Sequence, residues 1–186
     1  LKVVKIDKDT NEVIKRANIK FKIYNVSKKE YVCRKTDKTI CEFTTNSDGI
    51  LITPHPLIAG TYRLEEVDQP IDGYLWNKES ITFTIDENSK FINDNTLGVI
   101  FEVKFANKAV KGNVEINKLG ESLDLTENGY IYNQVNVKNV KIGLYANEDI
   151  YNSVGILIYR KDSLIKELTT NDKGYAKVDN LYLGKY

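Results

Sequence analysis

The sequence has few of the residues that carry most metal-binding and nucleophilic chemistry. Its 186 residues include one histidine, His55, two cysteines, Cys33 and Cys41, and no methionine. Two cysteines are too few for a structural zinc site, which has four ligands. His55 stands between two prolines and is expected to be a loop residue, because no nucleophile that it could activate is identifiable. We therefore expect no metal, no cofactor and no enzyme that turns over repeatedly.

A charge imbalance and long apolar runs are also missing. With 27 basic and 26 acidic residues the net charge is +1, which gives no electrostatic footprint for nucleic acid or for an acidic membrane surface. No apolar run approaches the roughly 20 residues of a membrane-spanning helix, and no signal peptide is recognisable. The absence of methionine predicts a segment excised from a longer protein, so that sorting and anchoring signals would lie outside it.

What the sequence does contain is a series of short runs in which polar and apolar residues alternate. Turn-forming clusters such as Asn46–Gly49 and Asp94–Gly98 separate these runs, and helical patterns are scarce. Short strands at regular spacing predict an antiparallel β-sandwich. The predicted strands of the first half of the chain are 19–25, 29–34, 39–44, 60–67, 80–85 and 99–107.

The two cysteines fall in one predicted hairpin. This hairpin is expected to turn near Asp37 and to place Cys33 opposite Cys41. A disulfide would form between them in an oxidising compartment. Two free thiols are the alternative, and the sequence leaves both open.

The chain also repeats itself in order. Later segments match earlier ones: 116–120 matches 3–7, 140–145 matches 19–24, 170–174 matches 45–49, and 181–186 matches 57–62. The spacing between matches grows after the first pair, which predicts an insertion at Glu121–Gln134 in the second copy. Ordered matches at a long period predict tandem domains of one type. We expect two tandem Ig-like or prealbumin-like antiparallel β-sandwiches, residues 1–110 and 111–186, the second incomplete at its C-terminal end.

Three polar residues occupy positions where the alternation calls for hydrophobic side chains. Lys5, Glu66 and Asn107 each follow apolar residues spaced two apart, and therefore share their face of a predicted strand. Burying an unpaired charge is costly, so such groups pair, neutralise or react. An amine, a carboxyl group and an amide in one dry place could make a covalent Lys–Asn isopeptide bond.

The segments around these residues resemble a known family. Val-Val-Lys-Ile-Asp-Lys-Asp at 3–9 resembles the first strand of the collagen-adhesin B-type (CnaB-like) domains of Gram-positive surface adhesins and pilins. Ala59–Tyr74 resembles their signature, in which Gly-x-Tyr-x-Leu-x-Glu is followed by Pro and by Gly-Tyr, and Phe105–Lys108 resembles their last strand. The resemblance covers the first copy completely and the second up to its last residue.

The resemblance implies an autocatalytic isopeptide bond between Lys5 and Asn107, with Glu66 as the proton shuttle. Glu65 is the rival of Glu66, but alternation points it to the other face. In the second copy Lys118 matches Lys5 and is expected to stay unpaired, because this chain contains no counterpart of Glu66 or Asn107 there. The crosslink would form once per molecule, so it would not make the protein an enzyme in the turnover sense.

Burial would lower the pKa of the lysine and expose its lone pair. A protonated Glu66 would donate a hydrogen bond to the side-chain oxygen of Asn107 and pass on the proton that lets ammonia leave. Each residue also has an ordinary alternative: a lysine that reaches water, an asparagine in a turn, a glutamate exposed on the rim.

Two further groups of residues have an ordinary explanation that we prefer. Asp7–Glu12 has calcium-ligand chemistry but lacks the glycine and distal glutamate of an EF-hand loop, so a solvated turn is expected. Tyr74, Trp76 and Phe83 could form a ligand patch, but capping of the sandwich core is expected for at least one of them.

By resemblance, the chain is expected to be a structural stalk or backbone module of an adhesin or pilus on the cell wall of a Gram-positive bacterium. Its partners would be neighbouring domains of the same surface protein. The alternative is that the modules themselves bind a host ligand such as an extracellular-matrix protein. A transthyretin-like enzyme or carrier is disfavoured, because no catalytic cluster is found beyond Lys5, Glu66 and Asn107.

Overall fold

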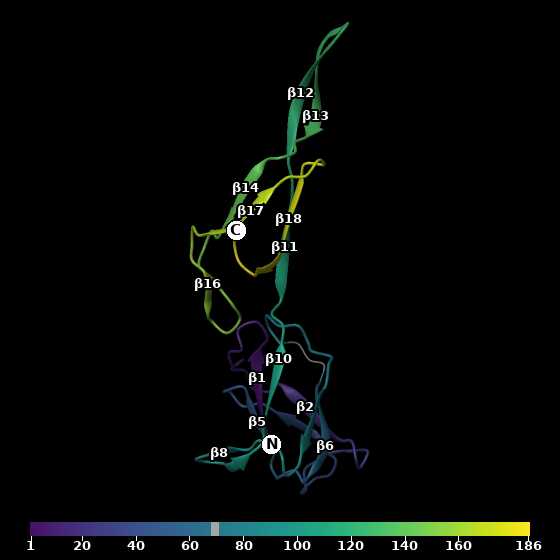
Figure 1. Ribbon diagram of the computed structural model, residues 1–186, viewed down its shortest axis with the longest axis vertical. Helices are drawn as coiled ribbons and strands as arrows, with labels where there is room; N and C mark the ends of the chain where they lie inside the picture. The colour runs from purple at the N-terminus through teal and green to yellow at the C-terminus, as the bar shows by residue number, and fades with distance from the viewer. Residues whose placement is uncertain (68–70) are drawn as a thin grey trace. The chain divides into compact units, whose positions relative to one another are not determined.

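The computed structural model describes residues 1–67 and 71–186 (Figure 1). Pro70 of the signature segment lies outside the described residues. The chain folds into two compact units, Leu1–Ala109 and Val110–Tyr186. In the described part of the chain the regular structure is strand, which confirms the predicted all-β class. No helix there is long and apolar enough to cross a membrane.

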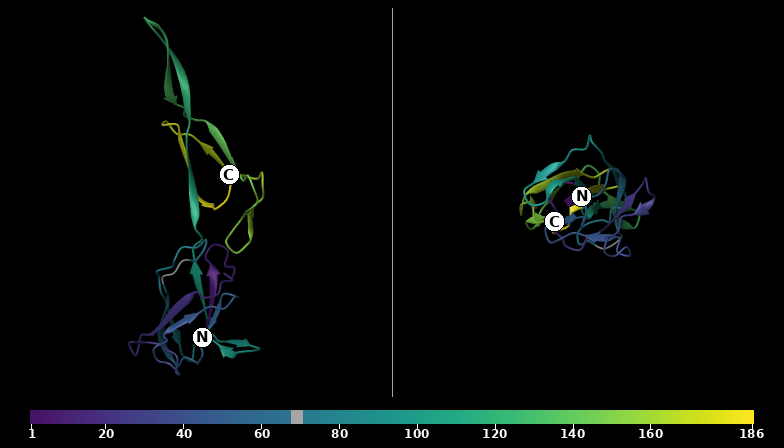
Figure 2. Two further views of the ribbon diagram at one scale, coloured as in Figure 1. Left: turned by 180° about the vertical axis from the view of Figure 1, so that it is seen from behind. Right: turned by 90° about the horizontal axis from the view of Figure 1, so that it is seen from below.

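The first unit contains two main sheets and a short hairpin (Figures 1 and 2). The smaller sheet has the strand order β10–β1–β5 and consists of β10 (Glu102–Asn107), β1 (Lys2–Asp7) and β5 (Ile50–Ile52). The larger sheet has the order β3–β2–β6–β7, and β4 also pairs with β2; its strands are β3 (Glu30–Tyr31), β2 (Lys20–Asn25), β6 (Gly60–Glu66), β7 (Ile81–Ile85) and β4 (Glu42–Thr44). The hairpin consists of β8 (Ile92–Asp94) and β9 (Gly98–Ile100).

The core of this unit lies between the two main sheets. Phe21 of β2 meets Phe105 of β10 edge to face, with ring centroids 5.2 Å apart. Strands β2, β6 and β10 bury every second residue, as the alternation predicts. The faces of β6 and β10 that carry Glu66 and Asn107 are the buried ones, whereas β1, which carries Lys5, is buried on both faces.

The first and last strands of the unit, β1 and β10, run parallel. Lys5 stands opposite Phe105, and Asp7 stands opposite Asn107. The predicted antiparallel pairing describes the other strand pairs of the described residues, but not this one. Parallel neighbours need a long connection, and here most of the unit lies between the two strands. The pairing brings Lys5 and Asn107 to one face of the sheet.

The cysteine segment differs from the predicted hairpin. Strands β3 and β4 both pair with β2 rather than with each other. The edge of β2 that does not face β6 offers its backbone groups to both short strands. Pairing of β3 and β4 with this edge competes with pairing of β3 with β4. Residues 32–41 leave the sheet as a loop, and a disulfide joins Cys33 to Cys41 at its base. The expected turn is present, since Asp37 accepts hydrogen bonds from the backbone and hydroxyl of Thr39.

The second unit consists of antiparallel strand pairs. They are β11 (Lys111–Asn117) with β18 (Tyr175–Tyr182), β14 (Lys141–Tyr145) with β17 (Leu164–Thr169), β15 (Ile150–Tyr151) with β16 (Leu157–Tyr159), and β12 (Leu119–Thr126) with β13 (Gly129–Asn136). The β12–β13 hairpin extends beyond the other strands of this unit (Figures 1 and 2). It contains Glu121–Gln134, the segment predicted as an insertion.

One turn recurs in both units with the same hydrogen bonds. Gly49 and Gly174 both have positive φ, +73° and +69°. The carbonyl oxygen of Gly49 accepts from the backbone N–H of Lys5 at 3.0 Å, and that of Gly174 accepts from Lys118 at 2.7 Å. The repeated sequence thus builds the same support beside both lysines.

Candidate crosslinking site

Lys5 lies near the middle of β1, and its side chain is fully buried. Its amine stands 4.5 Å from the ring centroid of Phe105 and 5.6 Å from that of Phe21. Burial among these rings lowers the pKa of Lys5 to about 8, although the nearby Glu66 carboxylate acts in the opposite direction. A neutral, nucleophilic amine is therefore accessible near neutral pH.

Glu66 ends β6, and its side chain is also shielded from solvent. Its Oε1 lies 2.8 Å from Nζ of Lys5. Glu65, its neighbour, lies on the other face, where Oε1 pairs with Nε of Arg63 at 2.5 Å and Oε2 accepts from the Tyr31 hydroxyl at 3.1 Å. Of the two glutamates, only Glu66 contacts Lys5.

Asn107 ends β10 and is fully buried. Its side-chain oxygen accepts a hydrogen bond from Nζ of Lys5. Its Nδ2 lies 3.0 Å from Oε2 of Glu66 and 3.3 Å from Oε1. Lys5, Glu66 and Asn107 therefore form a closed set of contacts in which each side chain touches the other two.

The position of Glu66 differs in one respect from the expectation. The sequence suggested that Glu66 would hydrogen-bond the amide oxygen of Asn107, but it contacts the amide nitrogen, while Lys5 contacts the oxygen. Register explains the difference, because β1 and β10 are adjacent and Glu66 reaches the pair from the opposite sheet. One carboxylate oxygen faces the nucleophile and the other faces the nitrogen that would leave.

The loop residues Leu75–Asn77 support the site. Of these the sequence pointed only to Trp76, as a member of a possible ligand patch or core cap and not as a residue of the crosslinking site. The backbone N–H of Asn77 donates to Oε2 of Glu66 at 3.1 Å, and its Nδ2 donates to the Ala106 carbonyl at 2.9 Å. The indole N–H of Trp76 donates to the Glu66 carbonyl at 3.2 Å. This segment thus ties the end of β6 to the end of β10. Most of these contacts involve backbone groups, so only the nearby Gly73-Tyr74 of the signature could have drawn attention to the loop.

Asp7 is a second buried carboxylate, and the prediction of a solvated position for it is wrong. It was expected in a solvated turn, but it is fully buried. The hydroxyl of Tyr74 donates to its Oδ2 at 2.8 Å, and the backbone N–H groups of Asp9 and Thr10 donate to its Oδ1. Hydrogen bonds from all three donors compensate the cost of burial. Asp7 anchors the turn that ends β1, two residues beyond Lys5.

The remaining candidates differ in how far they are buried. Tyr74 and Phe83 are buried, so they belong to the core rather than to a surface patch. Lys118 is exposed between β11 and β12. His55 lies in the loop before β6.

A family comparison bears on the first unit, whose two sheets and buried polar set define a prealbumin-like β-sandwich. The family model of the SpaA prealbumin-like fold domain matches residues 1–97. The chain belongs to this family, which confirms the predicted prealbumin-like all-β fold and the resemblance to CnaB-like domains. A search of curated proteins finds no match.

Three solved structures are similar to the chain at low identity. They are the pilus 2b backbone protein of group B streptococcus (22% identity, TM-score 0.46, 58% of this chain covered), a streptococcal ancillary pilin (16%, 0.40, 97%) and the major pilin subunit of Bacillus cereus (15%, 0.41, 96%). The chain spans 40%, 49% and 52% of their lengths, respectively. Because these TM-scores are low, we derive no function from them.

Proposed function

We propose that this chain is a structural stalk or backbone module of a Gram-positive surface adhesin or pilus, displayed outside the cell and anchored to the cell wall. Its first unit is rigidified by an autocatalytic isopeptide bond between Lys5 and Asn107. The observation that supports this proposal is the closed set of contacts among Lys5, Glu66 and Asn107 in a site without solvent access.

The geometry suits a direct proton relay. Glu66 takes a proton from the Lys5 amine through Oε1, and the neutral amine attacks Cγ of Asn107. Glu66 then delivers a proton to Nδ2 through Oε2. The bond between Cγ and Nδ2 breaks and ammonia leaves, while the new bond between Nζ of Lys5 and Cγ of Asn107 remains. Glu66 also takes the second amine proton from the nitrogen of the new bond and passes it to the departing ammonia, which leaves as ammonium, so that Glu66 is again a carboxylate. Folding supplies proximity, which is worth roughly 7–11 kcal/mol of barrier in well-aligned reactions.

The product would fasten β1 to β10, the first and last strands of the unit. A crosslink that closes a loop of about 100 residues stabilises by about 4.7 kcal/mol in the chain-entropy treatment used for disulfides. Under tension the two terminal strands could not be peeled apart. We further propose that residues 1–110 and 111–186 are tandem domains of one type, in which Lys118 is the unpaired counterpart of Lys5.

Intact mass tests the crosslink. The wild-type chain should be lighter than its sequence mass, corrected for the disulfide, by one ammonia. Glu66→Ala and Lys5→Ala should each restore the missing mass, whereas Glu65→Ala, the matched control on the opposite face, should not. A wild-type chain of full mass would rule out the bond.

One observation favours the alternative, binding of a host ligand by the modules themselves. The β12–β13 hairpin exposes large apolar side chains, among them Leu125 and Tyr132. Such exposed surface often marks an interaction site. Retention of an extracellular-matrix protein by the immobilised chain, lost in Leu125→Ser, would support this alternative.

A further inference from the structure

The β12–β13 hairpin presents an apolar face without a partner among the described residues. Leu123 stands opposite Tyr132 and Leu125 opposite Tyr130, so these four side chains share one face. Their exposed fractions are 51%, 70%, 74% and 69%. Each strand pairs only with the other. An isolated two-stranded hairpin is marginally stable in water, so this face would gain stability from contact with another surface.

The hairpin is also acidic. Residues 119–137 contain Glu121, Asp124 and Glu127 and no lysine, arginine or histidine, which gives a net charge of −3. Glu121 lies in β12 on the same face as Leu123 and Leu125, and Glu127 lies in the turn that joins the two strands. Asp124 lies on the opposite face of β12, where it accepts a hydrogen bond from Nδ2 of Asn133. A surface that fits the hairpin would therefore combine apolar contacts with positive charge.

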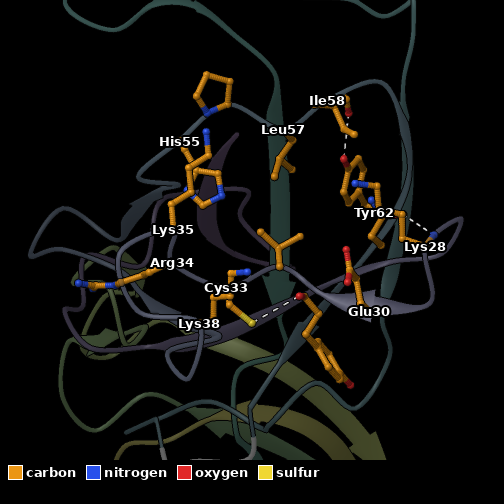
Figure 3. A pocket seen from close by; sticks show the side chains of 14 residues that line it. Lys28, Glu30, Cys33, Arg34, Lys35, Lys38, His55, Leu57, Ile58 and Tyr62 are labelled. Carbon is orange, nitrogen blue, oxygen red and sulfur yellow. Dashed lines mark hydrogen bonds between the residues drawn. The ribbon is translucent and has the colours of Figure 1, made fainter.

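The first unit contains a surface of that kind. A cavity of about 670 Å³ lies between the disulfide loop, the β2–β3 turn and the segment before β6 (Figure 3). This volume falls within the roughly 300–1,000 Å³ of protein ligand pockets. Its apolar lining includes Val32, Leu57, Ile58 and Tyr62.

The charge of this cavity is opposite to that of the hairpin. Four cations line it, Lys28, Arg34, Lys35 and Lys38, against one carboxylate, Glu30, which leaves a net charge of +3 with neutral histidine. Arg34, Lys35 and Lys38 come from the disulfide loop, and Lys28 lies on the other side (Figure 3). Within residues 1–67 and 71–186, no carboxylate forms a salt bridge with Lys28, Lys35 or Lys38.

From these two surfaces we infer that the acidic, apolar β12–β13 hairpin of one copy of the chain docks into the basic cavity of another copy. The cavity supplies an apolar lining that the exposed side chains of the hairpin can contact. It also supplies cations that can pair with the carboxylates of the hairpin. The two surfaces are different, so the contact is heterologous: the copy that supplies the hairpin keeps a free cavity, and the copy that supplies the cavity keeps a free hairpin. Heterologous contacts that do not close into a ring produce linear assemblies. The inference deepens the proposed stalk function by naming a partner surface, but it does not depend on the isopeptide bond.

Sedimentation of the full chain tests the contact. At about 0.01 M salt, where the Debye length is about 30 Å, the chain should form concentration-dependent oligomers. At about 1 M salt, where screening acts within about 3 Å, it should shift toward the monomer. A chain that stays monomeric at low salt and high concentration would overturn the inference.

A charge swap identifies the surfaces. Glu121→Lys with Glu127→Lys, and separately Lys35→Glu with Lys38→Glu, should each abolish association, because like charges then meet. All four substitutions in one chain should restore it. The control pair Lys161→Glu and Lys173→Glu, at exposed positions outside both surfaces, should associate like the wild type.

Two results of the swap would contradict the docking. If only the hairpin substitutions abolish association, the hairpins pair with one another instead. If the fourfold variant stays monomeric while circular dichroism shows a native fold, the two surfaces do not meet. Association is measured by sedimentation and the crosslink by mass, so either proposal can fail without the other.

Discussion

Oε1 of Glu66 lies 2.8 Å from Nζ of Lys5, so that one proton can serve both groups. The resting ion pair and the reactive state, a neutral amine beside a protonated carboxyl group, contain the same number of protons. The populations of the two states therefore keep a fixed ratio until the pair loses its shared proton.

This sharing predicts the pH dependence of crosslinking. Burial lowers the pKa of Lys5 from 10.5 to about 8, so the pair loses its proton above pH of about 8. The rate should be constant at and just below neutral pH and fall about tenfold per unit above pH of about 8. Chain prepared in an unfolded state that has not yet crosslinked would be folded at a series of pH values, and mass spectra taken during folding would measure the rate. A rate that instead rises to a plateau near pH 8 would show that Glu66 acts as a carboxylate and not as an acid.

Asn77 is expected to position Glu66. Asn77→Ala keeps the backbone N–H that faces Oε2 of Glu66 but loses the Nδ2 donor to Ala106, which ties the loop to β10. Loss of this hydrogen bond, worth about 1 kcal/mol, should slow crosslinking about fivefold. Time-resolved intact mass during the first folding of chain prepared unfolded and not yet crosslinked would measure the rate.

A control separates positioning from general stability. Asn93→Ala removes an exposed amide on β8 and should crosslink at the wild-type rate. Asn77→Ala should also keep the pH midpoint of the wild type, since it alters no titrating group. An unchanged rate in Asn77→Ala would show that the loop covers the site without orienting it.

The sequence predicted which residues share a face of each strand, but it did not predict which strands lie next to each other. The buried faces of Lys5, Glu66 and Asn107 follow from a period of two, a local property of each strand. The parallel pairing of β1 with β10 joins residues about 100 positions apart, and no local pattern encodes that register. The contact of Glu66 with the amide nitrogen, rather than with the oxygen, depends on that register.

Loops were the least predictable part of the site. Asn77 contacts Glu66 through its backbone N–H, a group that every residue except proline has. Asp7 appeared solvated because it begins a polar stretch, but the distant Tyr74 hydroxyl and two backbone groups satisfy it in the interior. In the cysteine segment, the local turn signal was correct, while the open edge of β2 decided the strand pairing.

The disulfide is expected to stabilise the first unit without affecting the crosslink. Closing a loop of about nine residues is worth about 2–3 kcal/mol in the chain-entropy treatment. Replacing Cys33 and Cys41 by serine should lower the free energy of unfolding by up to that amount, while the mass still shows the loss of ammonia. Urea unfolding with and without reductant would test this. The reductant should destabilise the wild type and leave the double variant unchanged, and a reductant effect on both would contradict the prediction.

Gly49 should be required for the backbone support beside Lys5. Its φ is +73°, and an added Cβ would come within 2.1 Å of the Ile14 carbonyl oxygen. Gly98, with φ of +74° and nothing within 4 Å of such a Cβ, is the matched control. Gly98→Ala should lose only the roughly 1–2 kcal/mol of the left-handed conformation and still crosslink fully.

Gly49→Ala should lose more stability than Gly98→Ala, because the turn must also move away from Ile14. That movement would disturb the hydrogen bond from the Lys5 N–H to the Gly49 carbonyl, and with it the position of the amine. Crosslinking should therefore be slower in Gly49→Ala, as followed by mass, and the urea midpoint should be lower than in the control. Equal losses in the two variants would mean that backbone strain alone, and not the contact with Ile14, makes glycine necessary at this turn.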